Sequence, residues 1–203
     1  WNNALTYFQG FSSDYSPSNL SANCGSFVNG TIAVFGDSVV LDAANNSGVV
    51  VFTLSNLGAA DSYNFLNTAN ADVILVNVAG DVTKTGGQIR IDDTSFGSGP
   101  YIGAARTFIE KTLWNLHDAN TLNSSSFSWL GSVLAPNAEA TLTGGAINGQ
   151  VVGGGDVNQN NAFEFHNFCF NGDLSACDGS CALTIGTVTE DACNGGTTTM
   201  MTV

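Results

Sequence analysis

Residues 130–157, LGSVLAPNAEATLTGGAINGQVVGGGDV, decide the fold class of this chain. Short runs of β-branched and small apolar residues alternate with glycine and asparagine turns, and the pattern recurs about every twenty residues. No helical period interrupts it. A cycle of that length without a helix is typical of a β-solenoid, in which each turn buries its apolar side against the next. A β-sandwich would instead favour clean alternation and hairpin turns.

The same pattern continues on both sides of this stretch. LWNLHDANTL (113–122) precedes it, FEFHNFCFNG (163–172) follows it, and further short apolar runs lie upstream. Two of these runs, GVVVFTL (48–54) and ADVILVNVAG (71–80), are continuous rather than alternating, which indicates strands that are covered on both faces. The sequence therefore predicts an all-β fold, with residues 31–170 mostly in short stacked strands.

Two segments carry helical spacing. Near the N-terminus Trp1, Leu5 and Phe8 recur at the period of a helix, and Pro17 ends the pattern. We expect a short helix there that packs against the strands. The segment YIGAARTFIEKTLWNLHDA (101–119) fits a helix and also, in its second half, an alternating strand, so periodicity leaves it open.

Composition excludes several classes of partner. Charged residues make up 10% of the 203 residues, yet the formal net charge is −13, with only four lysines and arginines. Four basic side chains cannot follow a phosphate backbone, so we expect no nucleic acid partner. The acidity also opposes docking on anionic lipid. No apolar run reaches the length of a membrane span, so we expect no membrane insertion.

The stretch IAVFGDSVVLDAAN (32–45) raises the question of catalysis. Ser38 follows Gly-Asp in the way that a GDSL-type esterase presents its nucleophile. A serine hydroxyl needs a positioned base, and the esterase pattern supplies it as D-x-x-H. Trp114 and Phe163 stand three residues before His117 and His166, so neither histidine has that aspartate. We therefore expect no catalytic residue and no enzyme.

The cysteines suggest disulfides rather than a metal site. Their C-terminal spacing, C-x7-C-x3-C-x11-C, lacks the paired C-x2-C steps of a zinc site, and disulfides in an oxidising compartment fit it better. Because the chain has five cysteines, one is then left free or paired with something outside this chain. The candidate disulfide residues are Cys169, Cys177, Cys181 and Cys193.

Calcium and N-linked glycans are the other candidate additions. DVNQNN (156–161) opens like a calcium loop, but Asn161 and Asn167 stand where an EF-type loop needs glycine and a bidentate glutamate. We therefore expect no metal and no cofactor. Glycosylation matters only if the source secretes through a glycosylating route. The four sequons lie at Asn19, Asn29, Asn45 and Asn123.

The second half of the chain resembles a known family. Trp114-Asn115-Leu116, Gly131–Ala138, Gly145–Val152 and His166–Phe170, with Asn77–Gly80 upstream, occur in the order of the motifs of choice-of-anchor A domains of secreted and surface-attached proteins. The glycine-spaced repeats are also similar to those of bacterial ice-binding proteins. The resemblance implies a right-handed β-helix with a helix packed alongside. It implies no catalytic residues and an adhesive or structural role.

This resemblance sets the expected domain boundaries. Residues 1–174 are predicted to be the β-helix domain, without the strands that usually begin it. Residues 175–203 are predicted to be a disulfide-rich β tail that resembles the start of an Ig-like repeat of surface adhesins. That tail is too short to close a sandwich of about seven strands.

The C-terminal residues are the candidate for a contact between subunits. A terminal strand frays unless it is tied down, and open sheet edges accept strands from other chains. We expect the last residues to pair with a neighbouring copy in a head-to-tail filament, or else to fold back on their own domain. The candidate strand comprises Thr197, Thr198, Thr199, Met200, Met201, Thr202 and Val203.

Two functions follow as hypotheses. The favoured one is a non-enzymatic, extracellular structural or adhesive module at a cell surface, in a filament of its own copies. The alternative is an ice- or carbohydrate-binding domain that uses one flat face. Ice binding should show ranks of outward threonines at matching positions of successive coils, and the sequence shows EATLT (139–143) and TTT (197–199) without such a register.

Overall fold

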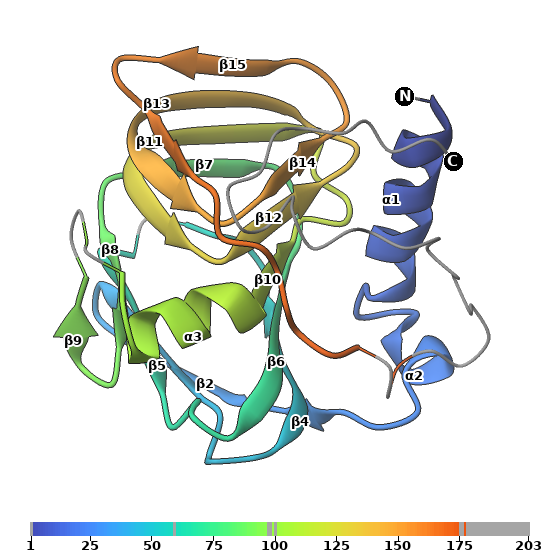
Figure 1. Cartoon of the computed structure of the whole chain (residues 1–203), viewed down its shortest axis with the longest axis vertical. Coiled ribbons are helices and arrows are strands. Elements are labelled where there is room, and N and C mark those ends of the chain that lie inside the picture. The colour runs from blue at the N-terminus through green and yellow to red at the C-terminus, as the bar shows by residue number, and fades with distance from the viewer. Residues whose placement is uncertain (1, 59, 97–98, 100, 175–176, 178–203) are drawn as a thin grey trace.

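The computed structural model describes residues 2–58, 60–96, 99, 101–174 and 177. Strands are the main secondary structure of these residues (Figure 1), which confirms the predicted all-β class. Their helices are α1 (Asn2–Asp14), α2 (Leu20–Asn23) and α3 (Ala104–Lys111). The predicted N-terminal helix corresponds to α1.

The strands of the described residues form three sheets, named A, B and C here and given in their spatial order. Sheet A contains β1 (Val28–Asn29), β4 (Gly48–Leu54), β6 (Ala71–Val78), β10 (Thr112–Asn115), β12 (Ser132–Ala135) and β14 (Val151–Gly153). Sheet B contains β2 (Thr31–Phe35), β3 (Ser38–Asp42), β5 (Ser62–Leu66), β8 (Gln88–Ile91) and β9 (Thr94–Ser95). Sheet C contains β15 (Val157–Asn160), β13 (Glu139–Asn148), β11 (Thr121–Leu130) and β7 (Val82–Thr85), with β16 (Glu164–His166) beside β13.

Parallel pairing dominates these sheets. Among the described strands only β2 with β3 and β8 with β9 run antiparallel. From β10 to β15 the chain alternates between sheets A and C. Leu113 pairs with Ser132, and Val133 pairs with Val151. The chain therefore returns to sheet A about every twenty residues, the period on which the sequence prediction was based.

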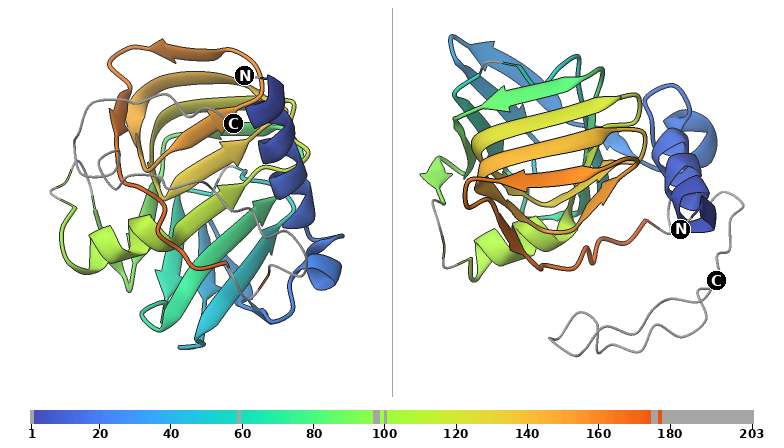
Figure 2. Two further views of the ribbon diagram at one scale, coloured as in Figure 1. Left: turned by 45° about the vertical axis from the view of Figure 1, so that its right-hand side comes forward. Right: turned by 90° about the horizontal axis from the view of Figure 1, so that it is seen from above.

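Helix α1 covers the outer face of sheet A (Figure 2). Phe8 and Phe11 of α1, and Tyr15 directly after it, pack on a layer of aliphatic side chains from four strands of the sheet. That layer consists of Val49, Val51, Val73, Leu75, Leu113 and Leu134. The alternate residues of the same strands face the core between the sheets. This double covering explains the continuous apolar runs and confirms the prediction made from them.

Aromatic side chains fill the core between the sheets. Trp114 and Trp129 are fully buried and lie edge to face, with ring centroids 5.4 Å apart. Each indole N–H has a partner, since Trp114 donates to the Leu130 carbonyl at 2.9 Å and Trp129 donates to the Ser124 hydroxyl at 3.0 Å. Both tryptophans are therefore structural.

The ambiguous segment 101–119 holds both predicted structures in succession. Helix α3 ends at Lys111, and Thr112 is already extended, with φ −102° and ψ 128°. The Thr112 hydroxyl donates to the Phe108 carbonyl at 2.6 Å and closes the last turn. Strand β10 begins at once. The helical spacing thus correctly predicted the first half of the segment, and the alternating pattern correctly predicted the second half.

Two glycines show why successive turns lie so close together. A Cβ atom at Gly149 would overlap the Gly131 backbone, and one at Gly154 would overlap the Pro136 carbonyl. Gly149 also has a positive φ of 155°. Only glycine allows the backbones to approach to this distance.

One disulfide ties the last described residue to the N-terminal part of the chain. Cys177 is bonded to Cys24, 153 positions away in sequence. Cys24 follows α2, so the bond joins the segment after sheet C to the start of sheet A. The predicted boundary after residue 174 stays a prediction, because most of 175–203 lies outside the described residues.

Candidate functional site

The outer face of sheet C is the candidate site. Along its strands, residues alternate between the core and solvent, as in any half-covered sheet. Val82, Leu122 and Leu142 point inward and are fully buried. Thr83, next to Val82, and the residues paired with it are exposed. No helix of the described chain packs on this side of sheet C (Figure 2).

The solvent-facing residues, exposed or half-buried, form two ranks that cross four strands. In the first rank Thr83 pairs with Asn123, Asn123 with Thr141, and Thr141 with Asn158. The second rank lies two residues further along each strand. Its members are Thr85, Ser125, Thr143 and Asn160. The eight side chains of the two ranks are called the polar ranks below.

The sheet fixes the spacing of the polar ranks. Adjacent strands lie about 4.8 Å apart, and residues two apart on a strand are separated by about 6.6 Å. The register is unbroken from β7 to β15 at these positions. The polar ranks therefore present hydroxyl and amide groups on a regular two-dimensional grid.

The polar ranks are chemically uniform. All eight are threonine, serine or asparagine, so none carries a charge, although the whole chain has a net charge of −13. Glu139, at the start of β13, is paired with Thr121 at the border of this surface. The grid offers hydrogen-bond donors and acceptors and threonine methyl groups. It contains no group that can serve as a general base.

A buried lysine, Lys84, holds β7, an edge strand of sheet C, from its core side. Lys84 lies between Thr83 and Thr85 but points inward, where it is 1% exposed. Its ammonium donates to the Ala60 carbonyl at 2.6 Å and lies 5.1 Å from the ring centroid of Phe127. Burial lowers the pKa of Lys84, and Asp61 opposes that shift. The contact joins sheet C to the segment that precedes β5.

A known family matches most of the chain. Residues 1–167 match the family described as "Putative Ice-binding-like adhesive domain". The chain belongs to this family. The matched range contains all eight residues of the polar ranks. No curated protein and no solved structure matches the chain.

Membership of the ice-binding-like adhesive family supports the coarser part of the predicted resemblance. It supports an adhesive, ice-binding-like domain and fits a non-enzymatic role. It is not a match to choice-of-anchor A domains. The absence of a threonine register over successive coils, noted in the sequence, holds in the sheet, because Asn123 and Ser125 of β11 lie between the threonines of β7 and those of β13. Thr83 and Thr141 share one rank, and Thr85 and Thr143 share the other.

The esterase candidate residues do not converge in this adhesive domain. The Ser38 hydroxyl, at the start of β3, accepts a hydrogen bond from the Ser62 hydroxyl at 2.9 Å. His166 lies 2.6 Å from Asn148 and 3.1 Å from Glu164, and His117 lies 3.8 Å from Asp118. Each histidine thus has carboxylate or amide neighbours of its own.

The calcium-like stretch is not a loop. Val157–Asn160 form strand β15, so successive side chains point to opposite faces and cannot converge on one ion. Asn158 and Asn160 belong instead to the polar ranks. Among the described residues, no group of three or more histidine, cysteine, aspartate or glutamate side chains is placed to hold a metal ion.

The candidate disulfide residues have different positions. Cys177 pairs with Cys24, and not with another of the four C-terminal cysteines to which the sequence analysis assigned the disulfides. Cys169 is also disulfide-bonded. Cys181 and Cys193 lie outside the described residues. The spacing of cysteines along the chain could not show a bond to Cys24, because the fold brings the two ends of the domain together.

The four sequons differ in their surroundings. The Asn19 amide donates to the Ser13 carbonyl at 3.1 Å. Asn29 and Asn45 are exposed at the end of the molecule where sheet A begins, and Asn45 has a positive φ of 57°. Asn123 belongs to the first polar rank. A glycan on Asn123 would therefore cover the candidate site.

The candidate strand Thr197–Val203 lies outside the described residues. In the part of the chain that the structure describes, no helix is long and apolar enough to cross a membrane.

The polar ranks themselves were missed at the level of sequence. The signal is a polar-x-polar triplet in each of the four strands: TKT (83–85), NSS (123–125), TLT (141–143) and NQN (158–160). The last three recur at the period of the coil. The first is separated from them by strands of sheets A and B and by α3, which hides the register.

Proposed function

We propose that this protein is a non-enzymatic, extracellular adhesive domain that binds hydroxylated solid surfaces through the polar ranks of sheet C. The observation that carries the proposal is the register of the eight uncharged side chains, Thr83 to Asn158 in one rank and Thr85 to Asn160 in the other. Ice and crystalline polysaccharide share the required chemistry, since both present regularly spaced hydroxyl groups.

Physical reasoning favours a solid surface over a small ligand. One hydrogen bond to a neutral group contributes only about 0.5–1.5 kcal/mol net, so a single site would bind weakly. Eight groups held rigidly by a sheet bind together, because little side-chain and backbone entropy remains to be lost. Threonine also places a methyl group beside each hydroxyl, which adds apolar contact with the surface.

We further propose that the three sheets are the faces of one right-handed β-helix. The parallel pairing of β10, β12 and β14 in sheet A supports this winding. Parallel crossover connections are right-handed in nearly all proteins, because only that hand packs a twisted strand back onto its sheet. A β-helix also flattens its sheets by stacking, which suits contact with a flat surface.

The proposed location is the cell exterior. The Cys24–Cys177 bond and the bonded Cys169 fit an oxidising compartment. The resemblance to choice-of-anchor A domains adds the proposal that the domain belongs to a surface-attached protein. An oxidising compartment and attachment to a surface both agree with an adhesive role.

Binding to solid surfaces tests the proposed function. The purified domain is incubated with growing ice, crystalline cellulose and crystalline chitin in separate experiments, and the bound fraction is measured. Thr141→Tyr places a bulky ring at the centre of the first rank and should reduce binding about tenfold or more, the loss expected when over ~1.4 kcal/mol of contact disappears. Thr94→Tyr, on the exposed β9 of sheet B, is the matched control and should bind like the parent.

The pattern of results shows whether the polar ranks bind ice or polysaccharide, and it can also reject them as the binding site. Loss of binding in Thr141→Tyr on ice alone assigns the face to ice, and loss on a polysaccharide alone assigns it to carbohydrate. Equal binding of both variants to every surface that the parent binds would show that the polar ranks are not the adhesive site.

A further inference from the structure

Strand β2 ends sheet B with its core-facing side uncovered. It forms a hairpin with β3, turning at Gly36 and Asp37, and no described strand pairs with its other edge. Ile32 pairs with Leu41, and Val34 pairs with Val39. Because paired residues share a face, Ile32 and Val34 lie on the side that faces the core.

The exposure of these residues shows that the core is open here. Leu41 is 0% exposed and Val39 is 8% exposed, whereas Ile32 is 37% and Val34 is 68% exposed. Beyond β3 the core-facing surface therefore continues for one strand that the described residues cover only in part. A groove of about 460 Å³ follows this side of β2. Its apolar lining is Ile32, Val34, Val39, Leu54 and Tyr63.

The open edge and the groove have the properties of a strand-docking site. An edge strand presents unpaired backbone N–H and C=O groups, and proteins normally cover or charge such an edge. Within Thr31–Phe35 there is no charged residue. An incoming strand would gain backbone hydrogen bonds from the edge and specificity from apolar side chains in the groove.

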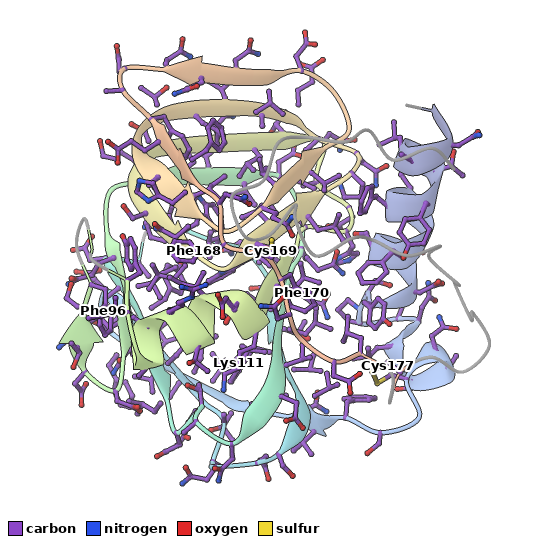
Figure 3. The ribbon with its side chains drawn as sticks, in the orientation of Figure 1. Phe96, Lys111, Phe168, Cys169, Phe170 and Cys177 are labelled. Carbon is purple, nitrogen blue, oxygen red and sulfur yellow. A yellow bond between two sulfur atoms is a disulfide. The ribbon has the colours of Figure 1, made fainter. Side chains whose placement is uncertain are left out.

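The disulfide indicates where the occupant comes from. Cys24 lies four residues before β1, and β1 is joined to β2 by Gly30 alone. The Cys24–Cys177 bond therefore holds residue 177 at the end of the molecule where β2 lies. Figure 3 shows Cys177 beside α2 at that end. Residues 178–203 continue from this point.

The length and composition of that segment fit the groove. Residues 178–196 span up to about 60 Å when extended, at roughly 3.3 Å per residue, which is ample to reach β2. The last seven residues, TTTMMTV, are uncharged and contain adjacent methionines, which adapt to irregular apolar grooves. A tether of this length also gives an effective concentration of about a millimolar.

We propose that residues 197–203 add to the outer edge of β2 as a further strand of sheet B in the same chain. Their apolar side chains then cover Ile32 and Val34 and close the open end of the core. This inference does not depend on the polar ranks, which lie on sheet C. It assigns a function to the C-terminal strand predicted from the sequence and places its docking site within the domain.

Hydrogen exchange of the β2 amides tests the proposal. In the full chain these amides should exchange at least tenfold more slowly than in a chain that ends at residue 196. Adding the peptide TTTMMTV at millimolar concentration to the shortened chain should restore the protection. Equal exchange rates in the full and shortened chains would overturn the proposal.

Two point variants separate docking from general damage to the hairpin. Val34→Asp places a charge in the groove and should remove the protection of β2 in the full chain. Phe35→Asp is the matched control, because Phe35 is also 68% exposed but does not line the groove, and it should keep the protection. Loss in both variants, or in neither, contradicts the assigned docking face.

Sedimentation velocity on the full chain distinguishes docking of residues 197–203 within one chain from their docking onto a second copy. The proposal expects a monomer with protected β2 at all concentrations. Protection that appears only with dimers or polymers, and disappears with residues 197–203, would overturn the same-chain assignment and give the segment to a second copy.

Discussion

Asn115 donates a hydrogen bond from its side-chain amide to the side-chain oxygen of Asn77 at 2.9 Å, and both side chains are fully buried. The same amide donates to the Ser12 carbonyl at 2.9 Å, and the Asn115 oxygen accepts from the Ser12 hydroxyl. This cluster joins β6, β10 and α1. It is the polar centre of an otherwise apolar contact between helix and sheet.

Asn115→Ala should therefore lower the free energy of unfolding by about 3 kcal/mol, because it leaves buried groups on Ser12 and Asn77 without partners. Urea unfolding measures the loss. Asn137→Ala is the control: its amide bonds to the His117 carbonyl at 3.1 Å, but the residue is exposed, so water replaces the contact. Equal losses in the two variants would contradict the role of the buried cluster.

Gly154→Ala should destabilise the domain strongly, by about 2 kcal/mol or more, because the added methyl group overlaps the Pro136 carbonyl and forces successive turns apart. Gly10→Ala is the opposite case. Gly10 lies inside α1 with open space around the position of a Cβ, so alanine should stabilise by about 0.5–1 kcal/mol. Thermal unfolding of both variants checks the opposite signs, and a shared sign would show that close approach is not the cause.

Much of the fold was accessible from sequence because its signals are local. The turn glycines around Gly149 and the continuous run Gly48–Leu54 each reflect a constraint that acts within one cycle of the chain. Close backbone approach requires glycine, and a strand between two apolar layers requires apolar residues at every position. The helix–strand boundary at Thr112 was the exception. Both periods were visible there, but only packing decides where one gives way to the other.

The candidate site was much less accessible, because its information is distributed. Thr83 and Asn123 become neighbours only after the chain has passed through sheets B and A and α3. Their triplets are ordinary polar strand sequences when taken singly. The Cys24–Cys177 bond likewise joins residues that are far apart in the sequence. Its partners are set by the three-dimensional path, so spacing along the chain could not pair them.

Lys111 should make stability depend on pH. The residue is 8% exposed, and its ammonium donates to the carbonyls of Thr68 and Ala71, each at 2.8 Å. Burial lowers its pKa below the ordinary 10.5, and Asp72 opposes the shift. Because the unfolded chain then binds more protons than the folded one, stability should rise with pH up to about 10.5.

Comparison with Lys111→Met isolates this effect. The free energy of unfolding of the parent minus that of the variant should increase between neutral pH and pH 10.5. Arg106→Met, which removes an exposed partner of Glu110, should show no such trend. A difference that stays flat with pH for Lys111→Met would falsify the assigned shift.

The Cys24–Cys177 bond should contribute a large part of the stability of the domain. It closes a loop of 153 residues, for which the chain-entropy model gives about 5 kcal/mol. The double variant Cys24→Ser with Cys177→Ser should melt about 10–20 °C lower, at roughly 2–4 °C per kcal/mol for a chain of this size. Scanning calorimetry measures the shift. An unchanged melting temperature would show that packing of α1 and α2 alone holds this end together.

The adhesive contact should be insensitive to salt. Because the polar ranks carry no charge, their binding to a hydroxylated surface contains no ion pairs to screen. The bound fraction on the surface chosen by the parent domain should therefore change less than about twofold when salt rises from ~0.05 to ~0.5 M, over which the Debye length falls below about 5 Å. A cationic resin is the positive control, since a chain with a net charge of −13 should leave it over the same range. Loss of adhesion to the hydroxylated surface in parallel with loss from the resin would mean that acidic side chains, rather than the grid of Thr83, Thr141 and their neighbours, carry the contact.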